Sequence, residues 1–162
     1  MERSRTLRSI RLLLAFFIAA LAVSGLTAVP LRAELEAANH FIAQATWAPE
    51  AVAAWLLIVR DAVDSTLREY PFLGYGTDWL AFAHIVIALA FLGPLRDPVR
   101  NRWAMEWGMA ACLLVVPTAL IFGALRGIPW WWRLVDCSFG AFGVIPLWIC
   151  RRLTLRLEGS RG

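Results

Sequence analysis

Four apolar runs, each close to the length that a helix needs to cross a lipid bilayer, constrain this chain more than any other feature. A hydrocarbon core of about 30 Å requires roughly 20 apolar residues in an α-helix. The runs cover residues 12–29, 79–95, 103–125 and 134–150. They predict an all-α integral membrane protein with four transmembrane helices, in which residues 1–162 form a single membrane domain.

The amino-acid composition agrees with this prediction. Hydrophobic residues make up 60% of the 162 residues and charged residues 17%, whereas about a quarter of the residues in a soluble domain are charged. The three cysteines, Cys112, Cys137 and Cys150, lie inside or at the end of apolar runs. We therefore expect them to act as small hydrophobic residues and not as a disulfide framework.

The first apolar run also has features of a signal peptide, because a basic segment precedes it and small residues lie near its end. The apolar region of a cleaved signal peptide is roughly 7 to 15 residues long. The run 12–29 is longer, and we therefore interpret it as a membrane span. Cleavage would leave three spans.

Arginine positions predict the orientation, because positive charge is retained on the cytoplasmic side of a membrane. All 16 basic residues are arginine, and the formal net charge is +4. The 11 on the predicted inner side are Arg3, Arg5, Arg8, Arg11, Arg96, Arg100, Arg102, Arg151, Arg152, Arg156 and Arg161. Both termini are thus expected in the cytoplasm, and the basic charge indicates topology and some attraction to anionic lipid, not nucleic-acid binding.

Residues 30–78, between the first and second runs, are too polar to cross a membrane. Apolar residues recur at helical spacing from Leu31 to Ala45, and a second amphipathic pattern begins at Pro49. The polar face of the second pattern contains Arg60, Asp61, Asp64 and Arg68. The segment predicts an extracytoplasmic amphipathic helical hairpin that lies on the outer mouth of the spans or partly inside it.

His84 is the sharpest chemical signal, because an ionisable residue inside an apolar helix is costly and usually faces protein or a cavity. The small residues Ala81 and Ala88 share its helical face. His84 is therefore a candidate ligand of a haem or chlorin, or a hydrogen-bond partner of a quinone carbonyl. The favoured interpretation is a neutral histidine bonded to a neighbouring helix, because no second histidine lies in a span.

Asp136 lies about one turn inside the fourth run, on one face with Gly140 and Gly143. Glycines at this spacing let a second backbone approach closely, so we expect this face to pack against a helix. Pairing of the carboxylate with Arg133, three residues earlier, or with Arg126 of the preceding loop is the favoured interpretation. A carboxylate that handles a proton or binds a substrate is the alternative.

Asp78 precedes the second run and is a predicted N-cap. His84, Asp136 and Asp78 all fall in the outer half of the predicted membrane region, so they form a candidate cofactor-binding set. The sequence leaves open whether the three side chains meet. No catalytic residue and no metal ligand is predicted, and the absence of a cofactor is the favoured expectation over a haem, chlorin or quinone.

At the inner end, Glu106 follows Arg102 by four residues, a spacing typical of an ion pair on one helix. The loop RDPVRN adjoins this pair and contains Arg96 and Arg100. Phosphate recognition by this arginine-rich turn is an alternative use of the cluster, although no glycine loop accompanies it.

The stretches GYGTDWLAFAHIVIALAFLGPLRDPVRN and RGIPWWWRLVDCSFGAFGVIPLWICRR resemble a family of small bacterial multi-pass membrane proteins with four helices. The resemblance covers roughly residues 70–152, about half of the chain. It implies a bacterial cytoplasmic (inner) membrane setting, and it brings no activity and no functional residues.

These features favour a non-catalytic accessory or scaffold subunit that packs against itself or against other membrane subunits in the lipid bilayer. The alternative is a membrane-embedded binding or redox module that uses His84 with Asp136 or Asp78 for a quinone, haem, chlorin or lipid. An enzyme comes third, because the sequence provides no set of nucleophile, base and orienting group. A transporter would require an oligomer, because four spans without an inverted repeat are too few for alternating access.

Overall fold

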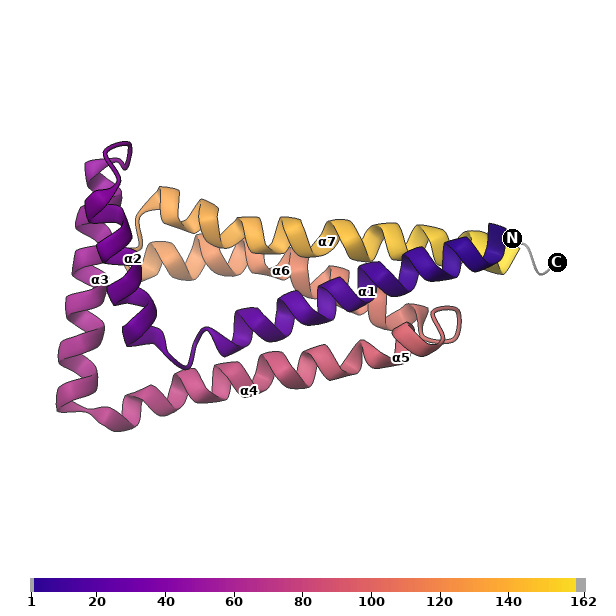
Figure 1. Ribbon diagram of the computed structural model, residues 1–162, viewed down its shortest axis with the longest axis horizontal. Helices are drawn as coiled ribbons and strands as arrows, with labels where there is room; N and C mark the ends of the chain where they lie inside the picture. Colours follow the sequence, from indigo (N-terminus) through magenta and orange to yellow (C-terminus); the bar gives the residue numbers. More distant parts are fainter. Residues whose placement is uncertain (1, 160–162) are drawn as a thin grey trace. The chain divides into compact units, whose positions relative to one another are not determined.

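The computed structural model describes residues 2–159, which are almost entirely helical and contain no β-strand (Figure 1). The elements in chain order are α1 (Glu2–Leu26), α2 (Leu31–Gln44), α3 (Glu50–Glu69), the 3₁₀ helix η1 (Pro71–Gly74), α4 (Tyr75–Ala90), α5 (Leu92–Arg96), α6 (Arg102–Leu125) and α7 (Trp130–Gly159). The predicted all-α class is therefore confirmed for the described part of the chain.

Within residues 2–159, four helical segments are long and apolar enough to cross a membrane. They are Glu2–Leu26, Pro71–Arg96, Arg102–Leu125 and Trp130–Gly159. At most 22% of the most apolar stretch of any of them is buried within the chain, so most of this apolar surface needs other apolar groups around it. Four such helices are compatible with a multi-pass membrane protein.

The second apolar segment is interrupted, in contrast to the continuous helix predicted over 79–95. Helix α4 ends at Ala90, and α5 begins at Leu92. Pro94 explains the break, because proline has no N–H to donate and its ring clashes with the carbonyl group four residues earlier, which belongs to Ala90. The helix also begins earlier than predicted, at Tyr75.

The first and fourth helices are longer than their apolar runs. Helix α1 begins at Glu2, in the arginine-rich segment, and ends at Leu26 instead of residue 29. Helix α7 continues past Cys150 to Gly159, and it buries Thr154 and Leu157 in this extension. Burial of these two side chains stabilises the helical conformation of the polar tail, which hydropathy alone does not predict.

The chain divides into two compact units, which contain residues 2–20 with 88–159, and residues 21–87. In the first unit, α6 and α7 run side by side (Figure 1). Its core contains Ile10, Leu14, Phe91, Met105 and Leu147, all of which are almost completely buried. The rings of Phe17 and Phe91 pack edge to face, with their centroids 4.8 Å apart.

The α6–α7 contact depends on two glycines of α7, as their spacing predicted. A Cβ atom added at Gly140 would lie 2.4 Å from the carbonyl oxygen of Cys112 on α6, and one at Gly143 would lie 2.6 Å from the Cys112 Sγ. Carbon atoms do not approach other heavy atoms this closely. The predicted close-packing face of α7 is therefore confirmed.

In the second unit, α2 and α3 pack against each other, and the end of α1 lies against α4. A Cβ atom added at Gly25 of α1 would lie 2.4 Å from the Cβ of His84 and 3.2 Å from the carbonyl oxygen of Ala81. The small residue at position 25 thus permits the contact between these two helices.

Replacement of either glycine of α7 by leucine should destabilise the protein, because the new side chain would displace the Cys112 backbone (at Gly140) or the Cys112 thiol (at Gly143) on α6. We expect Gly140→Leu and Gly143→Leu each to lower the free energy of unfolding by about 1–3 kcal/mol. Ala141→Leu is the matched control, because Ala141 is exposed on the same helix. Thermal unfolding in detergent measures the three variants, and equal losses in all of them would contradict a specific contact.

Candidate functional site

A buried asparagine joins α2 and α3. Asn39 is only 8% exposed, and its Nδ2 donates hydrogen bonds to the carbonyl oxygens of Leu35 (2.8 Å) and Leu56 (3.1 Å). The bond to Leu56 connects α2 with α3. A buried amide that lost this partner would leave a polar group unsatisfied, so the bond favours one register of the two helices.

Asp64 of α3 is the centre of a charged cluster between the same helices. Its carboxylate accepts hydrogen bonds from Arg32 of α2 and from Arg68 of α3. Arg32 Nη2 also lies 3.4 Å from the Asp64 carbonyl oxygen. The hydrogen bond from Arg68, and then that from Arg32, hold the pKa of Asp64 below its ordinary value.

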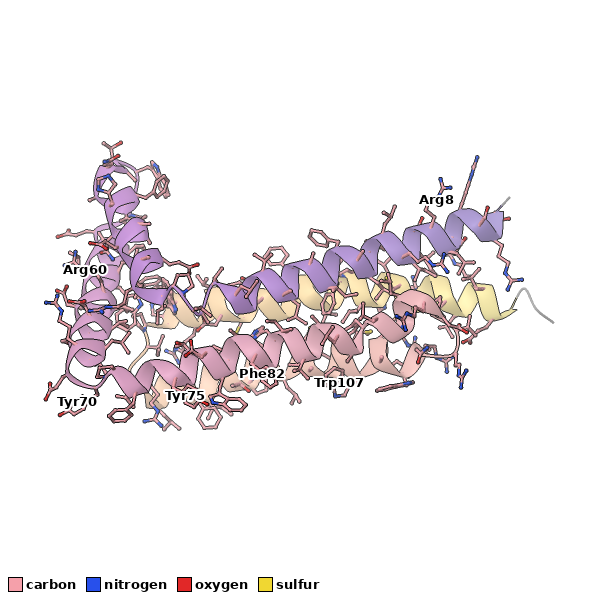
Figure 2. All side chains as sticks on the ribbon, turned by 60° about the horizontal axis from the view of Figure 1, so that its bottom comes forward. Arg8, Arg60, Tyr70, Tyr75, Phe82 and Trp107 are labelled. Carbon is pink, nitrogen blue, oxygen red and sulfur yellow. The ribbon has the colours of Figure 1, made fainter. Side chains whose placement is uncertain are left out.

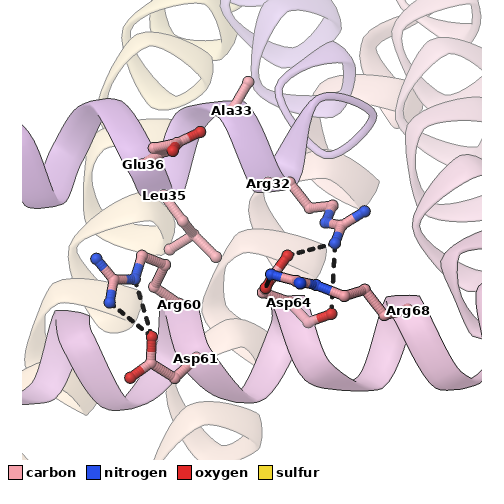
Figure 3. A pocket seen from close by; sticks show the side chains of 8 residues that line it. All are labelled: Arg32, Ala33, Leu35, Glu36, Arg60, Asp61, Asp64 and Arg68. Carbon is pink, nitrogen blue, oxygen red and sulfur yellow. Dashed lines mark hydrogen bonds and ion pairs between the residues drawn. The ribbon is translucent and has the colours of Figure 1, made fainter.

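The cluster forms one wall of a groove of about 580 Å³ between α2 and α3, which we call the α2–α3 groove (Figure 3). It is lined by Arg32, Ala33, Leu35, Glu36, Arg60, Asp61, Asp64 and Arg68. Arg60 donates from both Nε and Nη2 to Asp61 Oδ1, at 2.9 and 2.7 Å. The lining thus contains three guanidinium groups and three carboxylates.

This balance of charge determines what the α2–α3 groove can bind. A simple anion or cation meets as many repulsive as attractive groups in it. A polypeptide segment carries both hydrogen-bond donors and acceptors and can match both kinds of group, and such complementarity favours specific recognition. The chemistry of the groove is therefore suited to binding a polar peptide.

His84 is half-buried on α4. Its Nδ1 lies 2.8 Å from the Leu80 carbonyl oxygen, and because a carbonyl can only accept, Nδ1 carries the proton. In the neutral imidazole, Nε2 is then left with a lone pair. This tautomer can accept a hydrogen bond or coordinate a metal through Nε2, but it cannot donate to a quinone carbonyl.

Asp78 is an exposed residue in the first turn of α4 and not its N-cap, because the helix already begins at Tyr75. A carboxylate in a first turn still interacts favourably with the positive end of the helix. Three aromatic residues lie beside it on this side of α4: Tyr75 packs edge to face on Trp79, which packs in the same way on Phe82.

Asp136 is half-buried on α7. The predicted ion pair with Arg133 is not found among residues 2–159; instead, Arg133 Nη1 lies 3.4 Å from the Leu120 carbonyl oxygen on α6. The aliphatic stem of Arg133 covers Gly123, and a Cβ added there would lie 2.6 Å from it. The open backbone at Gly123 thus directs Arg133 to α6.

The structure brings two of the three predicted site residues onto one helix. Asp78 and His84 both belong to α4 and to the unit of residues 21–87, whereas Asp136 belongs to the other unit. The two residues on α4 are six positions apart, so their side chains leave the helix in directions about 120° apart around its axis. They therefore do not converge on one ligand.

The predicted Arg102–Glu106 ion pair is present and is part of a longer network. Arg102 Nε lies 3.4 Å from Glu106 Oε1, and Arg151 Nε donates to the same oxygen at 2.8 Å. Arg102 Nη1 also donates to Glu158 Oε2 at 2.6 Å. This alternation of charge connects α6 with the polar extension of α7.

Sequence reasoning missed Asn39 and Arg32 as components of the site. The i, i+4 spacing of Asp64 and Arg68 was visible in the sequence, but the register of α2 on α3 was not.

Comparisons of the chain with protein-family models, with curated proteins and with solved structures find no match.

The Asp64 cluster should make α2–α3 stability dependent on pH. Because the folded pKa of Asp64 lies below its ordinary value of 3.8, its contribution is complete above that value and is lost as the pH falls through the folded pKa. Asp64→Asn should remove the contribution at neutral pH. Amide hydrogen exchange of α2 and α3, corrected for intrinsic rates, measures the effect.

Glu36→Gln is the control for that experiment. It removes one carboxylate from the same groove, and Glu36 has no ion pair among the described residues. Its exchange should follow that of the wild type at every pH. Equal loss of protection in Asp64→Asn and Glu36→Gln would show that total charge, not the cluster, controls the α2–α3 pair.

Proposed function

We propose that the protein is a non-catalytic accessory subunit of a membrane complex and that its α2–α3 groove docks a polar segment of a partner subunit. The observation that carries the proposal is the balanced, preformed charge of the groove. Asn39 joins the two helices, and Arg32 bonds across them to Asp64. A partner therefore meets groups that are already oriented, which lowers the ordering cost of binding.

The proposal includes an arrangement in the membrane. Four apolar helices anchor the subunit in a bacterial cytoplasmic membrane, both termini lie in the cytoplasm, and α2 with α3 forms the extracytoplasmic hairpin. The arginine distribution supports this orientation. The amphipathic character of α2 and α3 supports their position at the membrane surface.

Site-directed cross-linking tests the docking proposal. In cells of the source organism, Ala33→Cys places a thiol in the lining of the groove, and Thr66→Cys places one on the opposite side of α3 by helical spacing. Both variants carry alanine in place of the three native cysteines. With a membrane-impermeant cross-linker, the Ala33→Cys variant should give one defined adduct, and the Thr66→Cys variant should give none. Addition of Arg60→Glu to the Ala33→Cys variant should abolish the adduct.

The mass of the purified wild-type protein in mild detergent completes the test. A complex heavier than one chain is expected, and an adduct of twice the chain mass would identify the partner as a second copy. A single-chain mass without an adduct at position 33 would overturn the proposal. Equal adducts at positions 33 and 66 would also overturn it, because the groove would then not be the binding surface.

A second candidate function is a binding or redox module that uses His84. The observation that favours it is the free Nε2 of this residue, which is the coordinating atom in the tautomer that the Leu80 bond requires. A haem or chlorin metal fits this chemistry. A quinone carbonyl does not, because it needs a donor.

Substitution of His84 separates the two functions. For the accessory subunit, we expect a purified protein without visible absorbance, and both His84→Gln and His84→Leu within about 1 kcal/mol of the wild-type unfolding free energy. The cost is small because the Leu80 carbonyl, the only hydrogen-bond partner of His84 within residues 2–159, lies one turn earlier in the same helix. A coloured wild type that loses its absorbance in both variants would favour the cofactor function.

A further inference from the structure

A second groove, chemically unlike the first, lies between the N-terminal part of α1 and α5. It has a volume of about 700 Å³, and both of its walls belong to the unit of residues 2–20 and 88–159. Its polar lining consists mainly of the guanidinium groups of Arg8, Arg11 and Arg96. Its apolar lining includes Leu12, Ala15 and Leu95. We call it the arginine groove.

The charge of the arginine groove is uncompensated. No carboxylate lines it among the described residues, and none of its three arginines forms an ion pair within residues 2–159. All three are exposed, and Arg8 projects away from the ribbon of α1 (Figure 2). Arg11 Nη2 lies 3.4 Å from the Arg96 carbonyl oxygen, which holds it between the two walls.

The arginine groove lies where the polar start of α1 meets its apolar run. Arg8 and Arg11 lie in the last polar turn before the apolar run, which begins at Leu12. Leu12 is itself 65% exposed. Arginines at the end of an apolar helix lie at the level of the lipid head groups, whichever side of the membrane this end faces. The groove therefore combines cationic groups at head-group level with apolar surface toward the acyl chains.

We propose that the arginine groove binds the phosphate of an anionic phospholipid, and that one acyl chain of this lipid lies against Leu12 and Ala15. Guanidinium groups match phosphate oxygens with paired hydrogen bonds. Basic pockets beside membrane helices bind anionic head groups in this way. A zwitterionic lipid would bind less tightly, because the three arginines would repel its ammonium group.

The same phosphate chemistry also occurs in inorganic phosphate, which would use the arginines alone. The exposed apolar lining favours the lipid, because a lipid tail buries this apolar surface and a free ion does not. This proposal is independent of the docking function, because the arginine groove and the α2–α3 groove share no residue.

Lipid retention by the whole protein tests the assignment. Wild-type protein is reconstituted into nanodiscs of phosphatidylcholine that contain a minor fraction of phosphatidylglycerol, and native mass spectrometry counts the lipids that remain bound. Phosphatidylglycerol should be retained preferentially. Arg8→Gln/Arg96→Gln should weaken this preference by about tenfold or more, because each arginine near an anionic head group contributes about 1 kcal/mol.

Arg3→Gln/Arg5→Gln is the matched control, because it also removes two positive charges, from the part of α1 outside the groove. It should retain the wild-type preference. An equal loss of preference in both double variants would overturn the site in favour of nonspecific attraction, and so would no loss in either. A circular dichroism spectrum of each variant verifies that the helices are intact.

A measurement on the wild type alone distinguishes the two sources of phosphate. In detergent without anionic lipid, added phosphatidylglycerol should raise the thermal unfolding midpoint, whereas inorganic phosphate at the same ionic strength should not. Equal stabilisation by inorganic phosphate would overturn the lipid assignment. No stabilisation by phosphatidylglycerol would overturn it as well.

Discussion

Backbone hydrogen bonding is the constraint on which the whole structure depends. A chain that is 60% hydrophobic cannot place open N–H and C=O groups in an apolar environment without a cost of several kcal/mol for each. Helices satisfy these groups within the segment, and this explains why residues 2–159 are almost entirely helical. Where a helix is interrupted, the same requirement determines how the ends are satisfied. At the C-terminal end of α5, the Asn101 Nδ2 donates to the carbonyl oxygens of Gly93 and Asp97, at 3.2 and 3.0 Å.

The charged residues act in three different ways because their partners differ. Around Glu106, arginines and carboxylates alternate across α6 and α7 and stabilise a helix pair. In the α2–α3 groove, the same kinds of group are balanced in number but open to a partner. In the arginine groove they are unbalanced. The balance of charge, more than the number of charges, therefore separates the arginine groove from the other two clusters.

Helix contacts in this protein rely on small residues where backbones meet. Gly140 and Gly143 admit Cys112 of α6, and Gly25 admits His84. Gly108 admits the side chains of Phe91 and Leu147, which would lie 2.6 and 2.9 Å from an added Cβ. In an apolar environment, helix association gains little from the hydrophobic effect and depends on such close packing. The same glycines therefore give this chain its specific internal contacts, while most of its apolar surface remains exposed.

The sequence by itself determined the all-α class, the four apolar segments, the glycine face of α7 and the Arg102–Glu106 pair. Each of these follows from local spacing or from hydropathy, which are properties of one segment. It did not determine the break at Phe91, because a proline alone does not decide it: Pro117 and Pro146 lie inside the continuous helices α6 and α7. Nor did it determine the helical extension of α7 past Cys150, which depends on the burial of Thr154. Only the tertiary structure decided that Arg133 bonds to α6 instead of Asp136. It also decided that Arg32 completes the Asp64 cluster and that Arg8 and Arg11 share a groove with Arg96, because such contacts require the register of one helix on another, and the periodicity of a single helix carries no information about that register.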